Sequence, residues 1–263
     1  MYTFFLTLLK AVVLQLLGVL GVFFALGFVL SKLQEWTQKN YMRAVGWKGI
    51  LWTGWIGTPI HELGHAFFAK IFRHKVTRIA LFEPNKETGE LGTVEHSYST
   101  YNLYQRIGNF FIGAAPMIFG SLFLVLMLAF LVPNGREVFA PLRETDSLST
   151  VLNGVWNTLT HLFNKENILE WNFWLFLYIS FCIASHIAPS KEDRRGMWNG
   201  LIWIVLISLL INALTLLFGK DITQYILHVN NYLGVFIGIF VYALILSLVH
   251  FLLSVIILTP FRK

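Results

Sequence analysis

Two histidines with a glutamate between them form the pattern His61-Glu62-Leu63-Gly64-His65. On a helix, residues four apart lie about one turn from each other, so both imidazoles can bind one metal ion. The carboxylate of Glu62 can then act as a general base toward a metal-bound water. The surrounding stretch is apolar enough to cross a membrane, where ionisable groups are costly and mark functional sites. The pattern therefore predicts a metal site with His61 and His65 as ligands and Glu62 as the catalytic base.

A third metal ligand is expected in the segment from Ser185 to Gly196, because catalytic zinc usually takes three protein ligands and leaves one position for water. Asp193 is the predicted ligand, and His186 is the alternative, either as a ligand or as a partner of one. The spacing Ser190-x-x-Asp193 is also typical of a capping box that starts a helix. Two imidazoles and a carboxylate suit Zn²⁺, although iron or cobalt can occupy the same ligands.

The composition indicates an integral membrane protein. Hydrophobic residues make up 56% of the chain and charged residues only 13%, about half the share found in soluble domains. The net charge of +6 does not predict a nucleic-acid partner, because the basic residues flank apolar segments as they do beside a lipid bilayer. The single cysteine, Cys182, excludes a disulfide framework.

The elements that must position the site are predicted to be about six transmembrane helices, which makes the fold an all-α polytopic membrane domain over residues 1–263. Each predicted span has roughly the length that a hydrocarbon core of about 30 Å requires. The predicted spans are 8–31, 49–72, 109–132, 171–188, 198–219 and 233–259.

Two further elements are expected between the spans. Residues 76–82 and 91–98 are rich in β-formers around the turn-forming stretch 83–90, which predicts a β-hairpin between spans two and three. A free hairpin edge could hold an extended peptide, or the hairpin could only cover the membrane face. Residues 148–163 place apolar side chains on one helical face, which predicts an amphipathic helix on the membrane surface between spans three and four.

Six spans would place both termini, the 73–108 loop and the 189–197 loop on one side of the membrane. The basic cluster Lys191, Arg194 and Arg195 favours the cytoplasm for that side. We therefore expect a multi-pass protein of the cell membrane with both termini and the opening of the active site in the cytoplasm. Asp193 would reach the histidines because the chain crosses twice and returns. The small residues Gly113, Ala114 and Gly120 are expected to let the third span pack closely on the HELGH helix.

The HELGH motif, the third span with Gly113-Ala114-Ala115-Pro116 and the acidic motif after the fourth span together resemble the site-2 protease family of intramembrane zinc metalloproteases. The resemblance covers a three-span catalytic core at residues 49–200. It implies that His61, His65 and Asp193 hold zinc and that Glu62 activates water. The family usually places glycine directly after its aspartate, whereas Arg194 follows Asp193 here, so the chain resembles a divergent branch.

The expected activity is hydrolysis of a peptide bond in or near the transmembrane segment of a membrane protein or peptide. Three alternatives remain at this point: a non-proteolytic relative that binds membrane partners, a metal-handling transporter, and a membrane metalloprotease of the prenyl-peptide-processing type. The ionisable residues are concentrated in one helix and one loop, which favours a fixed catalytic metal over a transport path. The sequence leaves the substrate and the oligomeric state open.

Overall fold

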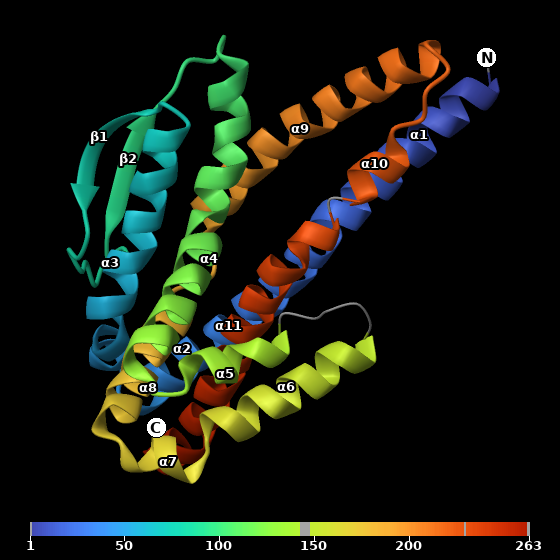
Figure 1. Cartoon of the computed structure of the whole chain (residues 1–263). Coiled ribbons are helices and arrows are strands. Elements are labelled where there is room, and N and C mark those ends of the chain that lie inside the picture. The colour runs from blue at the N-terminus through green and yellow to red at the C-terminus, as the bar shows by residue number, and fades with distance from the viewer. Residues whose placement is uncertain (1, 143–147, 229, 262–263) are drawn as a thin grey trace.

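Long helices run beside one another, and a two-stranded sheet lies along one of them (Figure 1). The computed structural model describes residues 2–142, 148–228 and 230–261. In chain order the elements are α1 (Tyr2–Leu16), η1 (Leu17–Gly21), α2 (Val22–Ala44), α3 (Trp47–Ile71), β1 (Lys75–Ala80), β2 (Thr93–Ser97), α4 (Leu103–Leu131), α5 (Gly135–Phe139), η2 (Ala140–Leu142), α6 (Leu148–Leu162), α7 (Lys165–Leu169), α8 (Trp171–Ala184), α9 (Lys191–Leu217), α10 (Thr223–His228), α11 (Asn230–Leu258) and η3 (Thr259–Phe261).

Four helical stretches of the described chain are long and apolar enough to cross a membrane: Phe4–Ala44, Leu103–Leu131, Lys191–Leu217 and Val235–Phe261. The first includes α1, the π-helical turn η1 and α2, which follow one another without a break. Helix α8 is apolar but shorter, and α3 does not meet the same criteria. A mainly helical, membrane-spanning architecture therefore agrees with the sequence prediction, whereas the number of six spans is not confirmed.

Helices α8 and α9 run in the same direction, with a break of six residues between them. Both pack against α4 and are antiparallel to it. The contacting pairs, in order along α4, are Phe110 with Gly200, Gly113 with Met197, and Gly120 with Ile183. The expected reversal of the chain at residues 189–197 is therefore wrong: α8 stops part of the way along the molecule, and α9 continues the same pass (Figure 1).

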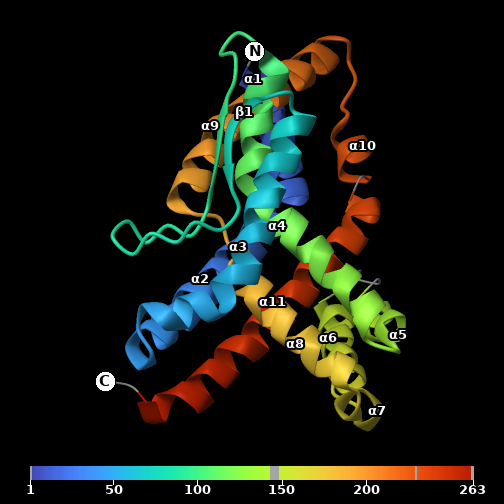
Figure 2. The ribbon, with the colours of Figure 1, turned by 90° about the vertical axis from the view of Figure 1, so that its left-hand side faces the viewer.

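The ends of the described chain lie at opposite ends of the molecule in both views (Figures 1 and 2). Helices α2 and α11 are parallel, because their contacting pairs advance together along both helices. Phe23 packs on Phe240, and the side chain of Asn40 donates a hydrogen bond to the side chain of Ser254. The expectation that both termini lie on one side followed from six passes and loses that support, while residues 1 and 262–263 lie outside the described chain.

Small residues allow α4 to approach its neighbours, as the sequence predicted, but the partners differ in part. A methyl group on Gly64 of α3 would lie 3.2 Å from the carbonyl oxygen of Ala115, so Ala115 does face the HELGH helix. Gly113 and Gly120 instead face the pass formed by α8 and α9, where a side chain on Gly113 would overlap the backbone of Asp193. At Gly113, α4 thus approaches the backbone of Asp193, the candidate for the third metal ligand, and packs directly against it.

The hairpin and the amphipathic helix both form at the predicted places. Strands β1 and β2 pair antiparallel, with Ala80 opposite Thr93. In α6, Val151, Val155, Leu159 and Leu162 pack on the main apolar core, whereas Leu152 and Trp156 are exposed. The sequence analysis had expected α6 to lie on the membrane surface. Instead, the greater part of its apolar face packs on the protein itself.

We predict that Gly113→Ala lowers stability by about 1–3 kcal/mol, because the added methyl group overlaps backbone atoms that α9 cannot move alone. The affinity of the Gly113→Ala variant for metal should fall too, because the added methyl group would displace the backbone of Asp193. Thermal unfolding in detergent and a metal titration measure both effects. Gly21→Ala is the matched control, because no atom of another residue lies within 4 Å of its added methyl group. Equal behaviour of the two variants would contradict the close α4–α9 contact.

Candidate metal centre

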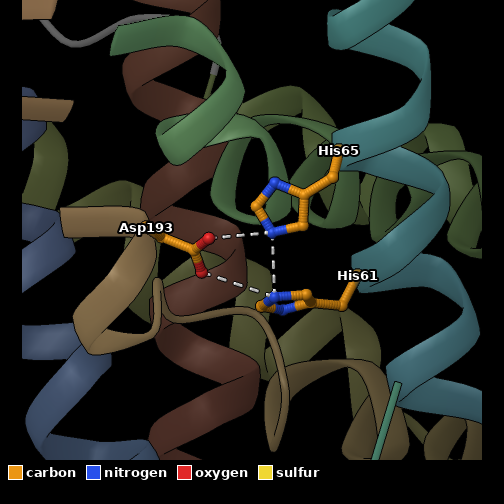
Figure 3. A group of neighbouring side chains, drawn as sticks. All are labelled: His61, His65 and Asp193. Carbon is orange, nitrogen blue, oxygen red and sulfur yellow. Dashed lines mark hydrogen bonds and ion pairs between the residues drawn. The ribbon is translucent and has the colours of Figure 1, made fainter. Parts of the chain in front are cut away.

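Helix α3 presents His61 and His65 on one face, as the four-residue spacing predicts. Their ring centroids lie 4.8 Å apart, and the two Nε2 atoms are separated by 3.1 Å. Both rings point toward the start of α9 (Figure 3). The first two predicted ligands are thus brought together by the helix alone.

The other nitrogen of each ring is held by a backbone carbonyl. His61 Nδ1 lies 2.6 Å from the carbonyl oxygen of His186, and His65 Nδ1 lies 2.8 Å from that of Ile112. Because a carbonyl oxygen can only accept, Nδ1 of each ring carries a proton, and in its neutral form each ring presents an unprotonated Nε2. This is the arrangement that fixes the tautomer and orientation of metal-binding histidines.

Asp193 completes the group from the first turn of α9 (Figure 3). Its Oδ1 lies 3.2 Å from His65 Nε2, and its Oδ2 lies 3.6 Å from His61 Nε2. Asp193 also forms the capping box with Ser190: its Oδ2 accepts from the Ser190 N–H, and its own N–H donates to Ser190 Oγ. The two interpretations of Asp193 are therefore compatible, since capping fixes the carboxylate that faces the histidines.

The three side chains have the spacing of a metal site. One nitrogen or oxygen atom from each lies within 4.8 Å of the others. Ligand atoms about 2.0–2.1 Å from a tetrahedral zinc ion are roughly 3.3 Å apart, close to the separations of 3.1, 3.2 and 3.6 Å found here. Two ring nitrogens and a carboxylate that converge in this way attract a cation to the point between them.

His186 contributes its backbone to the site, not its ring, and the alternative that made it a ligand is not supported by this geometry. Its carbonyl oxygen holds His61, while its ring Nδ1 donates to the carbonyl oxygen of Cys182 at 3.1 Å. The ring packs against Gly57 of α3, where any side chain would overlap it. His186 is therefore a neighbour that orients a ligand, the second of the two roles considered for it.

The break between α8 and α9 exposes backbone groups that a helix would satisfy, and helix α2 supplies partners for them. Gln38 Nε2 donates to the carbonyl oxygen of Ser185 at 2.9 Å, and Gln34 Oε1 accepts from the N–H of Ala188 at 2.7 Å. Buried backbone groups need such partners, above all in an apolar environment. The sequence analysis missed both glutamines, although their spacing of four residues in a long helix marks one polar face.

A second buried histidine braces the same break. His250 of α11 has a partner on each ring nitrogen: Tyr41 Oη at 3.0 Å from Nε2 and Ser185 Oγ at 3.0 Å from Nδ1. Its ring stacks on Phe181, with a centroid distance of 4.7 Å. His250, for which the sequence suggested no partner, thus joins α2 and α11 to the end of α8.

Glu62 lies beside the ligands in a cleft of about 840 Å³ that also contains His61, His65 and Asp193 among its lining residues. The loop of the hairpin passes directly over it: a side chain on Gly92 would come 2.9 Å from Glu62 Cγ. In Figure 2 this loop reaches out on the side where α9 begins, and residues of both segments line the cleft. The predicted base is therefore enclosed but open to a cavity that can hold water and substrate.

The hairpin is fixed to the helices by a pair of histidines outside the apolar segments. His74 Nδ1 lies 3.0 Å from His96 Nδ1, and His74 Nε2 lies 2.9 Å from the carbonyl oxygen of Gln105. Burial, with the positive charge that His74 would carry, lowers the pKa of His96 to about 4. His96 is therefore neutral at pH 7, and the hairpin gains stability above pH 6.5 that is lost as the pH falls toward 4.

The chain matches no protein-family model, and comparisons with curated proteins and with solved structures find no match either. The function is therefore inferred from the site itself.

We predict that Gln38→Leu weakens metal binding, but by less than the roughly 10–100-fold that the loss of a direct outer partner of a metal ligand typically costs. The substitution leaves the carbonyl oxygen of Ser185 without its donor, so the segment that holds His186 and Asp193 loses a constraint. Competition with a calibrated chelator measures the affinity. Lys39→Gln, at the next and exposed position of the same helix, is the control. An unchanged affinity in Gln38→Leu would show that α2 does not set the position of the break.

Proposed function

We propose that the protein is an intramembrane zinc metalloprotease of the site-2 protease type, which hydrolyses a peptide bond in or near a transmembrane segment. The observation that carries this proposal is the convergence of two unprotonated Nε2 atoms and a carboxylate, with Glu62 in the same cleft. That set of three ligands with an adjacent acid is the set that zinc peptidases use.

The residues fit zinc better than the hard cations. Imidazole nitrogen is a preferred ligand of zinc, whereas Mg²⁺ and Ca²⁺ favour oxygen ligands only. When bound, zinc would polarise the scissile carbonyl and lower the pKa of a coordinated water toward 7. A site with three protein ligands leaves room for that water, because tetrahedral zinc has a fourth position.

The chain's own residues would carry the proton transfers. Glu62 would take the proton of the attacking water and return it to the nitrogen of the leaving amine. His61 and His65 keep their orientation throughout, because the carbonyl oxygens of His186 and Ile112 hold their Nδ1 protons. The loop at Gly92 covers Glu62 and limits the access of bulk water from that side.

Strand β2 is suited to hold the substrate. Thr93, Val94 and His96 of β2 line the cleft that contains the ligands, whereas no residue of β1 does. The sheet has only these two strands in the described chain, and the outer edge of β2 is therefore free to pair with an extended peptide. A substrate helix would have to unwind locally, because its own backbone groups are otherwise occupied.

We predict that Glu62→Gln keeps the metal but lowers kcat for peptide hydrolysis by at least about 100-fold, since general-base catalysis typically contributes 10²–10⁴. Cleavage of labelled casein, an unfolded polypeptide, by zinc-loaded protein in detergent measures the rate, and elemental analysis measures the metal. Glu35→Gln, a carboxylate of the same cleft on α2, is the matched control and should retain activity. A wild-type protein that holds zinc but cleaves neither casein nor a single-span membrane protein would instead indicate a non-proteolytic binding protein.

A further inference from the structure

Two buried polar atoms on the wall of the cleft have no hydrogen-bond partner in the described part of the chain. They are Nδ2 of Asn109 on α4 and Nε2 of His186 in the break. The two residues are only 5% and 7% exposed. Leaving such groups unpaired is costly, and a native structure normally has a reason for each of them.

The two atoms have opposite hydrogen-bonding character. An amide Nδ2 can only donate. His186 Nδ1 donates to the carbonyl oxygen of Cys182, so Nε2 of the neutral ring can only accept. The cleft wall thus offers one donor and one acceptor, which are the complements of a peptide C=O and a peptide N–H.

Their positions bracket the metal ligands. His186 packs against Gly57, one turn before His61 on α3. Asn109 lies one turn before Ile112 on α4, whose carbonyl oxygen holds His65, and α3 and α4 are antiparallel. Ile112 is level with His65, so Asn109 is level with about residue 68 of α3, whereas His186 is level with Gly57. About eleven residues at 1.5 Å per residue separate the two groups by roughly 16 Å along the helix axis. An extended peptide covers that distance with about five residues.

We propose that Asn109 and His186 are two subsites for the main chain of the substrate, one on each side of the scissile bond. Asn109 Nδ2 donates to a substrate carbonyl oxygen, and His186 Nε2 accepts from a substrate N–H. Their ligand is therefore an unwound peptide segment recognised by its backbone, because an intact helix uses these groups internally. The inference rests on the proposed protease function and adds the residues that read the substrate.

The test uses zinc-loaded protein and two probes that differ in reach. Acetohydroxamic acid contacts the metal only. A phosphinic hexapeptide, in which a phosphinate and a methylene replace the central peptide bond, binds the metal and is long enough to extend to both subsites. We expect Asn109→Leu and His186→Phe each to lower the affinity for the phosphinic peptide by about tenfold, the effect of one lost hydrogen bond. Asn109→Leu should keep its zinc and its affinity for acetohydroxamic acid, and the affinity of His186→Phe for the peptide is compared with that variant's own affinity for acetohydroxamic acid.

The chain offers matched controls on the same two segments. Ser121 of α4 and Ser180 of α8 are also buried with unpaired hydroxyls, but neither lines the cleft. Ser121→Ala and Ser180→Ala should therefore bind both probes as the wild type does. A phosphinic peptide with methylated main-chain nitrogens tests His186 without any change to the protein: it should bind wild type less tightly and bind His186→Phe no more weakly than the unmethylated peptide does.

The outcomes separate the inference from the proposed function. Wild-type affinity for the phosphinic peptide in Asn109→Leu and His186→Phe would overturn the inference and leave the protease proposal intact, with the two groups serving only water. A wild-type protein that binds acetohydroxamic acid but gains nothing from the phosphinic peptide would overturn the peptide-binding cleft itself. Loss of the peptide's advantage in both variants, and in neither serine control, is the result that supports the subsites.

Discussion

The structure depends on one electrostatic constraint, the convergence of three unprotonated acceptor groups. His61 and His65 each donate a hydrogen bond from Nδ1 to a backbone carbonyl oxygen. Their Nε2 atoms therefore face each other and the carboxylate of Asp193, at distances of 3.1–3.6 Å. Such a cluster attracts a cation to its centre. The carbonyl oxygens that fix the rings come from α4 and from the break after α8, so the packing of three segments decides whether the cation site exists.

The break between α8 and α9 is the feature that places the third ligand. Six irregular residues separate α8 from α9, and the first turn of α9 starts at the level of the two histidines. Irregular backbone in an apolar environment persists only where partners satisfy it. Gln34, Gln38 and the side chain of Arg194 supply them, the last to the carbonyl oxygen of Pro189. The need for polar residues in α2 is thus a consequence of the site.

Much of the site could be predicted from the sequence, because HELGH is local: helical spacing alone brings His61, Glu62 and His65 together. The hairpin followed from β-formers around a turn. Asp193 lies beside the two histidines as expected, but by another path than the sequence suggested, since α8 and α9 run in the same direction. Hydropathy measures length and apolarity, not direction, so it could not show this. It also could not show that α6 packs on the core or that Gln38 meets Ser185, which depend on contacts far apart in the sequence.

The central claim is that these three side chains hold one zinc ion, and elemental analysis of the detergent-purified protein tests it most directly. Wild type, His65→Ala and Asp193→Ala should be compared after purification without chelators. The account predicts about one zinc per wild-type chain and a loss of metal in both variants. Wild-type protein without metal under these conditions, or zinc retained in full by Asp193→Ala, would contradict it.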